Sequence, residues 1–353
     1  MENCKDLKIL PDSICELKCL QTLNLSDCSK LAKLPPLNGL KSLKKLHLIS
    51  CGIIELPTQL SLSLVDLTLD HCSDFKILRD NICELKCLET LALRYCSNLE
   101  QIPPLNGLNS LKLLEIISTS IIGIPSELPS SLVHLSIMCC RNLKNFPTNI
   151  FELKSLQTLR LNGCLILEKL PSLNALTCLT SLGFSSSTIV EIPSELPSSL
   201  VHLSITDCRN LKILPANIFE LKSLQTLCLS GCTILKKLPP LNALTCLATL
   251  DLSSTAIVEI PAELPSSLKN LRLENCQYLR VLPRSIFGLK FLEIHLPDCS
   301  NLFKSLPLNV LRRLMFLSPS SRIEIQKEIT IRNRLSYRVA AAIRKRIKRL
   351  QKH

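Results

Sequence analysis

A twelve-residue pattern that recurs along most of the chain constrains its fold more than any other feature. The pattern reads Leu-x-x-Leu-x-x-Leu-x-Leu-x-x-Cys, and its closest copies lie 68 residues apart, at residues 17–28, 85–96, 153–164 and 221–232. Two related patterns lie between successive copies, so three units of 24, 23 and 21 residues make up one 68-residue cassette. Such a period predicts stacked repeats, each too small to be stable alone, instead of two or three separate globular domains.

Each twelve-residue pattern predicts a β-strand and the turn that follows it. In LQTLCL, Leu227 and Leu229 alternate with Thr226 and Cys228, which is the period of two expected for a strand with one buried face. Cys232 follows at the turn, where a small side chain is expected to point inward and satisfy a backbone carbonyl of a neighbouring coil. Prolines recur in the segments that return to the next strand and disfavour long helices there. One coil per unit would therefore stack parallel strands about 4.8 Å apart.

The cysteines indicate packing and not disulfide bonding. Eleven of the nineteen share the position at which the chain leaves the strand: Cys4, Cys28, Cys51, Cys72, Cys96, Cys140, Cys164, Cys208, Cys232, Cys276 and Cys299. The N-terminus carries no apolar signal segment, and no uninterrupted apolar run approaches the roughly 20 residues that span a bilayer. We therefore expect reduced thiols and a location in the cytoplasm or the nucleus.

These repeats resemble the leucine-rich-repeat family. More narrowly, LSGCTILKKLPP, STAIVEIP and LKSLQTLCLSGC resemble the repeats of plant TIR-NB-LRR disease-resistance proteins, and the resemblance covers about residues 1–317. It implies an α/β repeat solenoid, a leucine-rich-repeat horseshoe with a parallel β-sheet on the concave face and mostly non-helical convex arms. It also implies a sensing or regulatory module without a cofactor. No Gly-Lys pair occurs in the chain, so the nucleotide-binding P-loop of that family has no counterpart here.

The two ends of the chain depart from the repeat. Cys4 is in phase with Cys72, so the chain opens partway through a unit, without an N-terminal cap. At the other end we expect the solenoid (residues 1–317) to be followed by a basic linker and an amphipathic helical tail (residues 318–353). That tail holds eleven of the 42 Lys and Arg residues against two of the 29 Asp and Glu residues.

The basic cluster of the tail comprises Arg344, Lys345, Arg346, Lys348 and Arg349. Residues 345–348 fit a short import signal. The amphipathic helix that carries the cluster could instead bind an anionic membrane or an acidic partner, or be a solvated helix beside the solenoid. Nucleic acid is a further candidate, although Tyr337 is the one aromatic residue among these charges that could stack on a base. Binding of nucleic acid or membrane is expected only through this tail.

No catalytic constellation is evident in the sequence. His134 and His202 occupy the same repeat position, so duplication of the cassette explains their presence better than a catalytic role does. His47, Asp70 and His71 would lie on neighbouring strands and could chelate a metal, but the strong zinc spacings are missing. We therefore predict no enzyme activity, no metal and no small-molecule substrate.

The exposed strand positions are better candidates, and we expect another protein to bind them on the concave face. The candidate partner-binding residues are Lys45, His47, Asp66, Asp70, His71, Arg94, Tyr95, Arg272, Glu274 and His295. Arg94 and Tyr95 are the first choice because interface hot spots are enriched in Arg and Tyr. The middle units present mostly Thr, Ser and Gly, and the whole face could equally be a solvated polar surface.

Two other functions remain open from the sequence. A leucine-rich-repeat effector or ubiquitin-ligase adaptor would share the solenoid but needs a further catalytic or adaptor-binding domain. A scaffold with a basic tail would bind nucleic acid or membranes with a steep dependence on salt. For an immune receptor, the receptor domains that this chain lacks would be additional partners.

Overall fold

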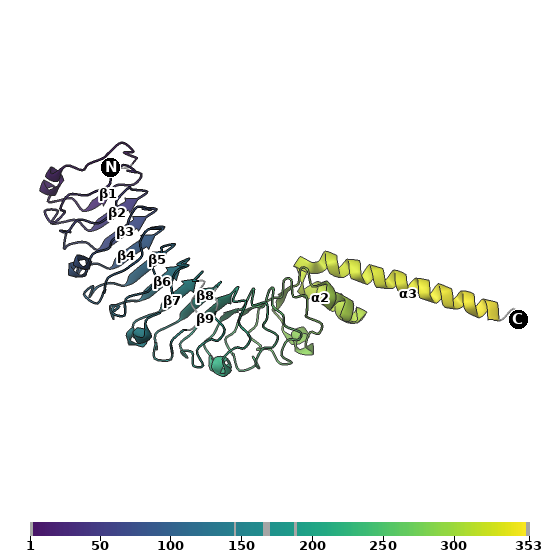
Figure 1. The fold of residues 1–353 in the computed structure, drawn as a ribbon. Helices are drawn as coiled ribbons and strands as arrows, with labels where there is room; N and C mark the ends of the chain where they lie inside the picture. The colour runs from purple at the N-terminus through teal and green to yellow at the C-terminus, as the bar shows by residue number, and fades with distance from the viewer. Residues whose placement is uncertain (1–2, 145, 165–169, 187–188, 351–353) are drawn as a thin grey trace.

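The computed structural model of the chain describes residues 3–144, 146–164, 170–186 and 189–350. Thirteen parallel strands lie side by side in sequence order and line the inner face of an arc (Figure 1). The strands are β1 (Thr22–Asn24), β2 (Lys45–Ile49), β3 (Asp66–Asp70), β4 (Thr90–Arg94), β5 (Leu113–Ile117), β6 (His134–Met138), β7 (Thr158–Asn162), β8 (Ser181–Ser185), β9 (His202–Thr206), β10 (Thr226–Cys228), β11 (Thr249–Asp251), β12 (Asn270–Arg272) and β13 (Glu293–His295). The predicted horseshoe with its concave parallel sheet is confirmed.

Leucine at every second strand position holds the coils together. In β2, Leu46 and Leu48 are fully buried, and His47 between them points to the concave side. The register sets Leu46 opposite Leu67 of β3 and Leu48 opposite Leu69, so each coil covers the apolar side chains of the next. Burial of one leucine contributes about 2 kcal/mol. A single coil has no partner for these side chains, which is why stability comes from stacking.

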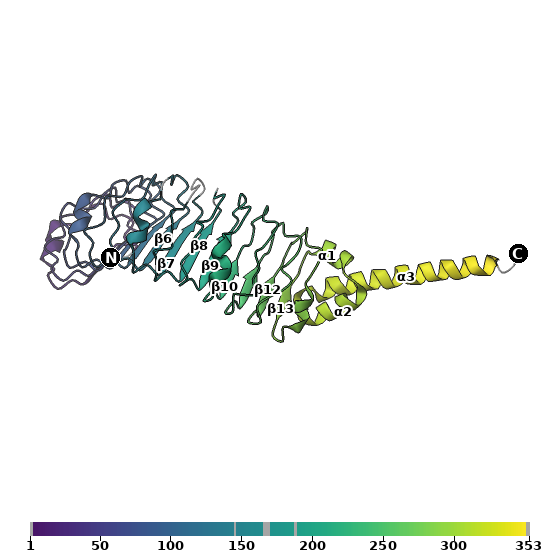
Figure 2. The same ribbon diagram turned by 90° about the horizontal axis from the view of Figure 1, so that it is seen from below.

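The return segments on the outer side are largely non-helical, as predicted. Their only regular elements in the described solenoid are short 3-10 helices, namely η1 (Asp12–Glu16), η2 (Asp80–Glu84), η3 (Thr148–Glu152), η4 (Ala216–Glu220) and η5 (Arg284–Gly288). They recur every 68 residues, and an extended residue precedes each one, which is proline in every case but Arg79. Proline fixes this extended entry and removes a helix donor, so the helix stays short. Figure 2 shows the return segments packed beside one another along the solenoid.

The eleven in-phase cysteines form what we call the cysteine ladder. Eight of them, Cys51, Cys72, Cys96, Cys140, Cys164, Cys232, Cys276 and Cys299, donate from Sγ to a carbonyl of the preceding coil, for example from Cys72 to Leu48 O at 3.2 Å and from Cys299 to Leu273 O at 2.9 Å. The predicted inward turn is confirmed for ten of the eleven ladder cysteines, which are buried, whereas Cys4 is exposed. Burial raises the thiol pKa to about 12 at several rungs, namely Cys96, Cys164, Cys232 and Cys299. No two cysteines of the described residues form a disulfide.

The residue before each ladder position has a left-handed backbone, which the sequence analysis did not anticipate. Its φ is positive in coil after coil, from 49° at Ser186 to 76° at Gly231. This single left-handed residue turns the chain off the strand and aims the next side chain inward. Gly, Asn and Asp at many of these positions were the available sequence signal, because they tolerate this conformation best.

The C-terminal end of the sheet is covered by a cap, which we define as residues 300–332. It comprises α1 (Ser300–Ser305), α2 (Leu308–Leu317), η6 (Pro319–Ser321) and the first turns of α3 (Arg322–Leu350). Residues 318–321, at the start of the segment expected to be a basic linker and helical tail, form η6 and the residue before it, and Ser318 and Ser321 are fully buried. Polar side chains of the cap accept hydrogen bonds from backbone N–H groups of the last coil. Leu296 N donates to Ser321 Oγ at 3.1 Å, and Asp298 N donates to Glu324 Oε2 at 3.2 Å.

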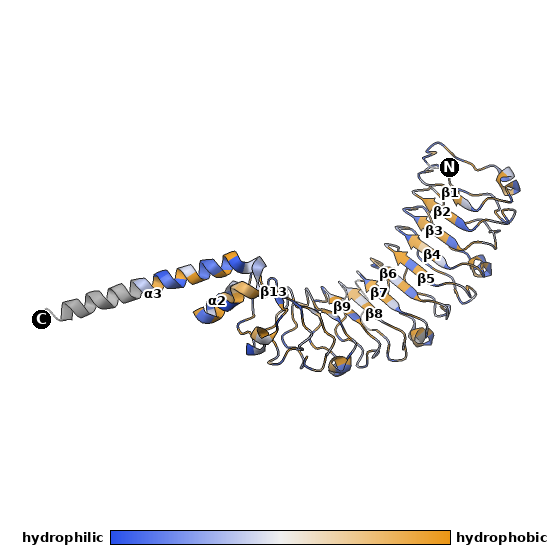
Figure 3. Cartoon of the chain, turned by 180° about the vertical axis from the view of Figure 1, so that it is seen from behind, coloured by the Kyte–Doolittle hydropathy of each residue, from blue (hydrophilic) through white to orange (hydrophobic). Residues whose placement is uncertain are grey.

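Helix α3 begins in this cap and then projects beyond the solenoid (Figure 1). Ile325 and Ile329 are buried, and Arg332 donates to the carbonyl oxygens of Leu306 and Phe303 at 2.6 and 2.5 Å. The positive charge of Arg332 stabilises the partial negative charge of the carbonyl groups at the C-terminal end of α1. The described part of α3 mixes hydrophobic and hydrophilic residues along its length (Figure 3). None of the helices in the described residues combines the length and apolarity that crossing a bilayer requires.

Candidate protein-interaction surface

The solenoid places most of the predicted partner-binding residues on the concave face. Lys45 and His47 come from β2, Asp66 and Asp70 from β3, and Arg94 from the end of β4. The register pairs Lys45 with Asp66 and Asp70 with Arg94, so these side chains lie on adjacent strands about 4.8 Å apart. We call this group, together with His71, Tyr95 and Glu115, the β2–β5 patch.

Arg94 is held in place by two carboxylates of the β2–β5 patch. Its Nε donates to Glu115 Oε2 at 2.9 Å, its Nη2 contacts the same oxygen, and its Nη1 lies 3.7 Å from Asp70 Oδ2. Partial burial lowers the pKa of the Arg94 guanidinium, but the hydrogen bond and the charge of Glu115 outweigh it, so that pKa is raised overall. Arg94 therefore presents a fixed, charged plane, one part of which is already occupied by Glu115.

His71 and Tyr95 extend this arrangement at the turns that follow β3 and β4. Their rings stack with centroids 4.3 Å apart and an angle of 21° between the planes, and His71 Nδ1 lies 2.6 Å from Asp70 Oδ1. Both residues have positive φ, 54° and 52°. That conformation costs about 1–2 kcal/mol for a bulky residue, and such strain often accompanies functional sites.

The three candidate metal ligands do not gather at one point, because His47 pairs with Asp66, whereas His71 pairs with Asp70. His47 Nε2 is 3.4 Å from Asp66 Oδ2, whose other oxygen accepts a hydrogen bond from Thr68 at 3.0 Å, while His71 pairs with Asp70. Throughout the described ranges, no three His, Cys, Asp or Glu side chains gather in a way that could hold a metal ion.

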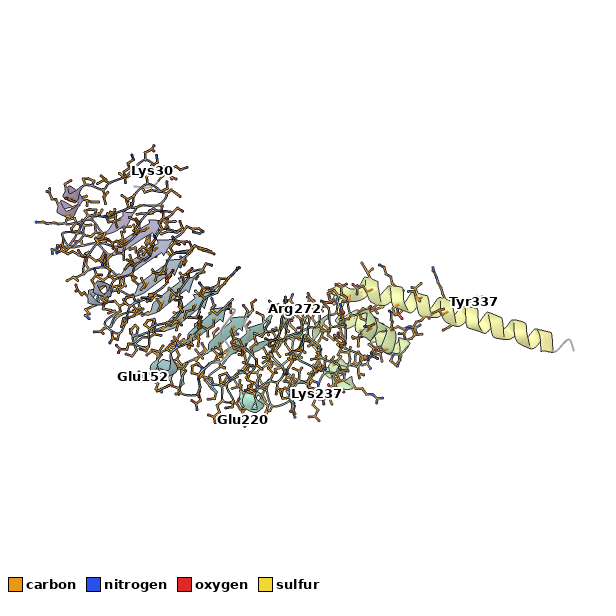
Figure 4. The ribbon with its side chains drawn as sticks, viewed as in Figure 1. Lys30, Glu152, Glu220, Lys237, Arg272 and Tyr337 are labelled. Carbon is orange, nitrogen blue, oxygen red and sulfur yellow. The ribbon has the colours of Figure 1, made fainter. Side chains whose placement is uncertain are left out.

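The second group of predicted residues lies at the other end of the sheet and is not brought together with the first. Arg272 Nη2 is 3.6 Å from Glu274 Oε1, and His295 Nε2 is 3.7 Å from Glu293 Oε1. Figure 4 shows Arg272 on the inner side of the arc, whereas Glu152 and Glu220 lie on the outer side. Six strands, β6 to β11, separate this group from the β2–β5 patch.

The basic cluster of the tail lies on the projecting part of α3. The backbone there is helical to Leu350, but the side chains of Arg344, Lys345, Arg346, Lys348 and Arg349 lie outside what the structure describes. Closer to the cap, Tyr337 is 79% exposed.

Sequence reasoning missed several charged residues of the concave face, among them Glu115 and Arg160. Glu115 is the middle residue of β5 and completes the clamp on Arg94. Arg160 is the middle residue of β7 and is exposed between the buried Leu159 and Leu161. The same alternation with leucine that revealed the other candidates could have revealed both.

Two open grooves lie among the return segments and not on the concave sheet. One, of about 820 Å³, is lined by residues 76–78, 80, 98 and 100–104, and the other, of about 580 Å³, by residues 237–238, 240, 242, 259–263, 281 and 283. Both are bordered by prolines and charged residues on the outside of the solenoid.

Comparison with known proteins finds relatives among plant disease-resistance proteins. The protein SUPPRESSOR OF npr1-1, CONSTITUTIVE 1 of Arabidopsis thaliana is 32% identical over 290 residues, which cover 74% of this chain and 20% of the relative. A probable disease resistance protein of Arabidopsis thaliana is 30% identical over 311 residues (79% and 17%), and TMV resistance protein N of Nicotiana glutinosa is 31% identical over 242 residues (65% and 21%). The chain thus spans about a fifth of the length of these relatives. No family model matches the sequence.

Solved structures support the same architecture. A leucine-rich-repeat protein of Leptospira interrogans is 27% identical, with a TM-score of 0.53 over 83% of this chain and 88% of that protein. The functional domain of InlJ from Listeria monocytogenes, which includes a cysteine ladder, is 16% identical, with a TM-score of 0.50 over 84% of this chain and 63% of that domain. The second likeness concerns the fold alone.

Proposed function

This chain belongs to the leucine-rich-repeat proteins, and from that premise we propose that its concave face recognises another protein without carrying out chemistry. The observation that supports this most is the ordered β2–β5 patch. There, Arg94 is fixed between Glu115 and Asp70, beside a His71–Tyr95 stack that is accessible to a partner. Groups that are already ordered lose little conformational entropy on binding, so their contacts contribute more to affinity.

We further propose that the chain is the sensing or regulatory part of a plant-type immune receptor that acts in the cytoplasm or the nucleus. The support is the similarity to disease-resistance proteins at about 30% identity over most of the chain. Signalling would then fall to receptor domains on other segments, and these domains are themselves candidate partners. Within this chain the β2–β5 patch is the primary contact region, and Arg272, Glu274 and His295 form a secondary one.

The test begins with a photo-crosslinking amino acid placed at one of two positions. Thr68 lies at the centre of β3 on the concave side, and Lys237 lies in a return segment on the outside. We expect a protein partner to be crosslinked from Thr68 and not from Lys237. Crosslinks from Lys237 alone would move recognition to the outer surface and overturn the proposal.

The partner identified in this way allows affinities to be measured on purified proteins. Arg94→Ala and Tyr95→Ala should each weaken binding by more than about 1 kcal/mol, because Arg and Tyr are typical hot-spot residues. Lys237→Ala serves as the control and should leave the affinity unchanged. Equal effects from all three variants would contradict a role for the β2–β5 patch.

A further inference from the structure

We propose that the centre of the concave face, strands β6 to β9, binds an acidic segment of the partner through Arg160. This inference rests on the proposed function and adds the chemistry of the partner. We call this region, comprising the inner side chains of β6 to β9, the central surface.

Arg160 differs from the two arginines that the sequence singled out. Arg94 is bonded to Glu115, and Arg272 lies 3.6 Å from Glu274, so both guanidinium groups already face a carboxylate. Arg160 is exposed on β7, and no ion pair involves it in the part of the chain that the structure describes. An arginine on an interaction surface without an internal partner keeps all its N–H donors for an external carboxylate.

Small neighbours leave the Arg160 side chain accessible. The register sets Ser136 of β6 on one side of Arg160 and Gly183 of β8 on the other, with Ser204 of β9 next to Gly183. A Cβ atom on Gly183 would lie 4.0 Å from Arg160 Cγ, which is ordinary contact, so the glycine is not required by sterics and simply leaves space beside the arginine. A partner chain can therefore approach the guanidinium from above without displacing a large side chain.

The central surface contains no acidic side chain. Its twelve residues are His134, Ser136, Met138, Thr158, Arg160, Asn162, Ser181, Gly183, Ser185, His202, Ser204 and Thr206. Asp207 follows at the turn after β9. The nearest carboxylates in the same row of the sheet as Arg160 are Glu115 and Asp251. Glu115 lies two strands from Arg160, or about 10 Å at the usual strand spacing, and Asp251 lies four strands from it, or about 19 Å.

Carboxylates at both ends of the sheet add selectivity. Asp66, Asp70 and Glu115 lie on β3 and β5, and Asp251, Glu274 and Glu293 lie on or beside β11 to β13. An acidic segment would be repelled by both ends and attracted to the centre, which fixes its position along the arc. The hydroxyl and amide groups around Arg160 can donate further hydrogen bonds to the same carboxylates.

The test measures binding of a fluorescent hexaglutamate peptide to the full chain at low salt, with hexaglutamine as the uncharged counterpart. Five tail residues are first replaced by Gln so that the tail does not capture the probe: Arg344, Lys345, Arg346, Lys348 and Arg349. On this background, Arg160→Gln should weaken hexaglutamate binding about tenfold, as expected for loss of one charge-assisted pair. Arg160→Lys should retain part of the affinity, because lysine keeps the charge but loses the bidentate geometry.

The matched control is Arg209→Gln, which removes an exposed arginine outside the sheet and should change the affinity less than twofold. Hexaglutamate that fails to bind, or that binds equally to the Arg160→Gln variant, would overturn the inference. So would stronger competition by an oligouridylate than by hexaglutamate, since that would indicate a nucleic acid. In each of these cases, crosslinking of a protein from Thr68 would leave the proposed function intact.

Discussion

The rings of His71 and Tyr95 stack across adjacent coils, and both residues adopt a left-handed backbone. Most other coils place Gly, Asn, Asp or Ser at this position. Here two bulky side chains accept the strain, and the stack lies directly beside the Asp70 and Arg94 side chains. The solenoid therefore stores strain where we place the primary contact region.

This strain predicts an unusual order of stability at residue 95. Tyr95→Gly should be more stable than Tyr95→Ala by about 1 kcal/mol, because both variants lose the stack but only glycine adopts positive φ without strain. Urea unfolding of the two variants measures the difference. At Thr90, within β4, the alanine variant Thr90→Ala should be more stable than Thr90→Gly, since glycine weakens an ordinary strand. A Tyr95→Gly variant that is no more stable than Tyr95→Ala would show that the left-handed backbone of Tyr95 stores no strain.

The cap predicts a contrast between two isoleucines of α3. Ile325 is fully buried and Ile323 is 72% exposed. Ile325→Ala should lower the free energy of unfolding by about 2–5 kcal/mol, whereas Ile323→Ala should change it by less than about 0.5 kcal/mol. Thermal unfolding followed by circular dichroism checks both. A small effect at Ile325 would mean that the cap does not contribute to the stability of the solenoid.

The cysteine ladder predicts a loss of stability in alkaline solution. Burial raises the pKa of Cys96, Cys164, Cys232 and Cys299 from 9.0 to about 12, so these thiols stay protonated in the folded chain while they ionise in the unfolded chain. The unfolded state then binds fewer protons. The free energy of unfolding should therefore fall as the pH rises from about 9 to about 12, by at most about 1.4 kcal/mol per pH unit for each thiol.

A threonine variant isolates this effect from the titration of lysines and tyrosines. Thr119 and Thr255 already occupy the ladder position in two coils. Cys96→Thr should therefore fold and show a shallower decline of stability between pH 9 and pH 11. Urea unfolding at several pH values measures the slope, and an unchanged slope would mean that Cys96 does not contribute to it.

Glycine at the left-handed position is predicted to be required in one coil. A Cβ atom on Gly231 would lie 2.2 Å from Asp207 Oδ1 and 3.0 Å from Asp207 Cα, and the φ of Gly231 is +76°. Gly231→Ala should lower the free energy of unfolding by about 1–2 kcal/mol. Gly288→Ala is the control, because nothing lies within 4 Å of its added Cβ, and it should be neutral or slightly stabilising. Equal stability of the two variants would contradict the steric argument.

Several features could be predicted from the sequence because they repeat. The alternation of Leu227 and Leu229 with polar neighbours fixed the strand, and the cysteine after it fixed the inward turn. Most of the concave candidates followed from the same alternation. Glu115 and Arg160 also obey it, but nothing in one strand reveals which charges on neighbouring strands neutralise each other.

The sequence by itself determined the coil, since side chains at every second strand position either meet a neighbouring coil or face solvent. Only the tertiary structure decided how coils of 24, 23 and 21 residues align. That alignment sets Arg94 against Glu115 and leaves Arg160 between Ser136 and Gly183. It also brings Ser321 and Arg332 back onto the end of the solenoid, which no local pattern indicates. The physical reason is that pairing of charges and coverage of an exposed edge depend on contacts between residues about 20 to 30 positions apart in sequence. Strand formation depends on neighbours within a few residues.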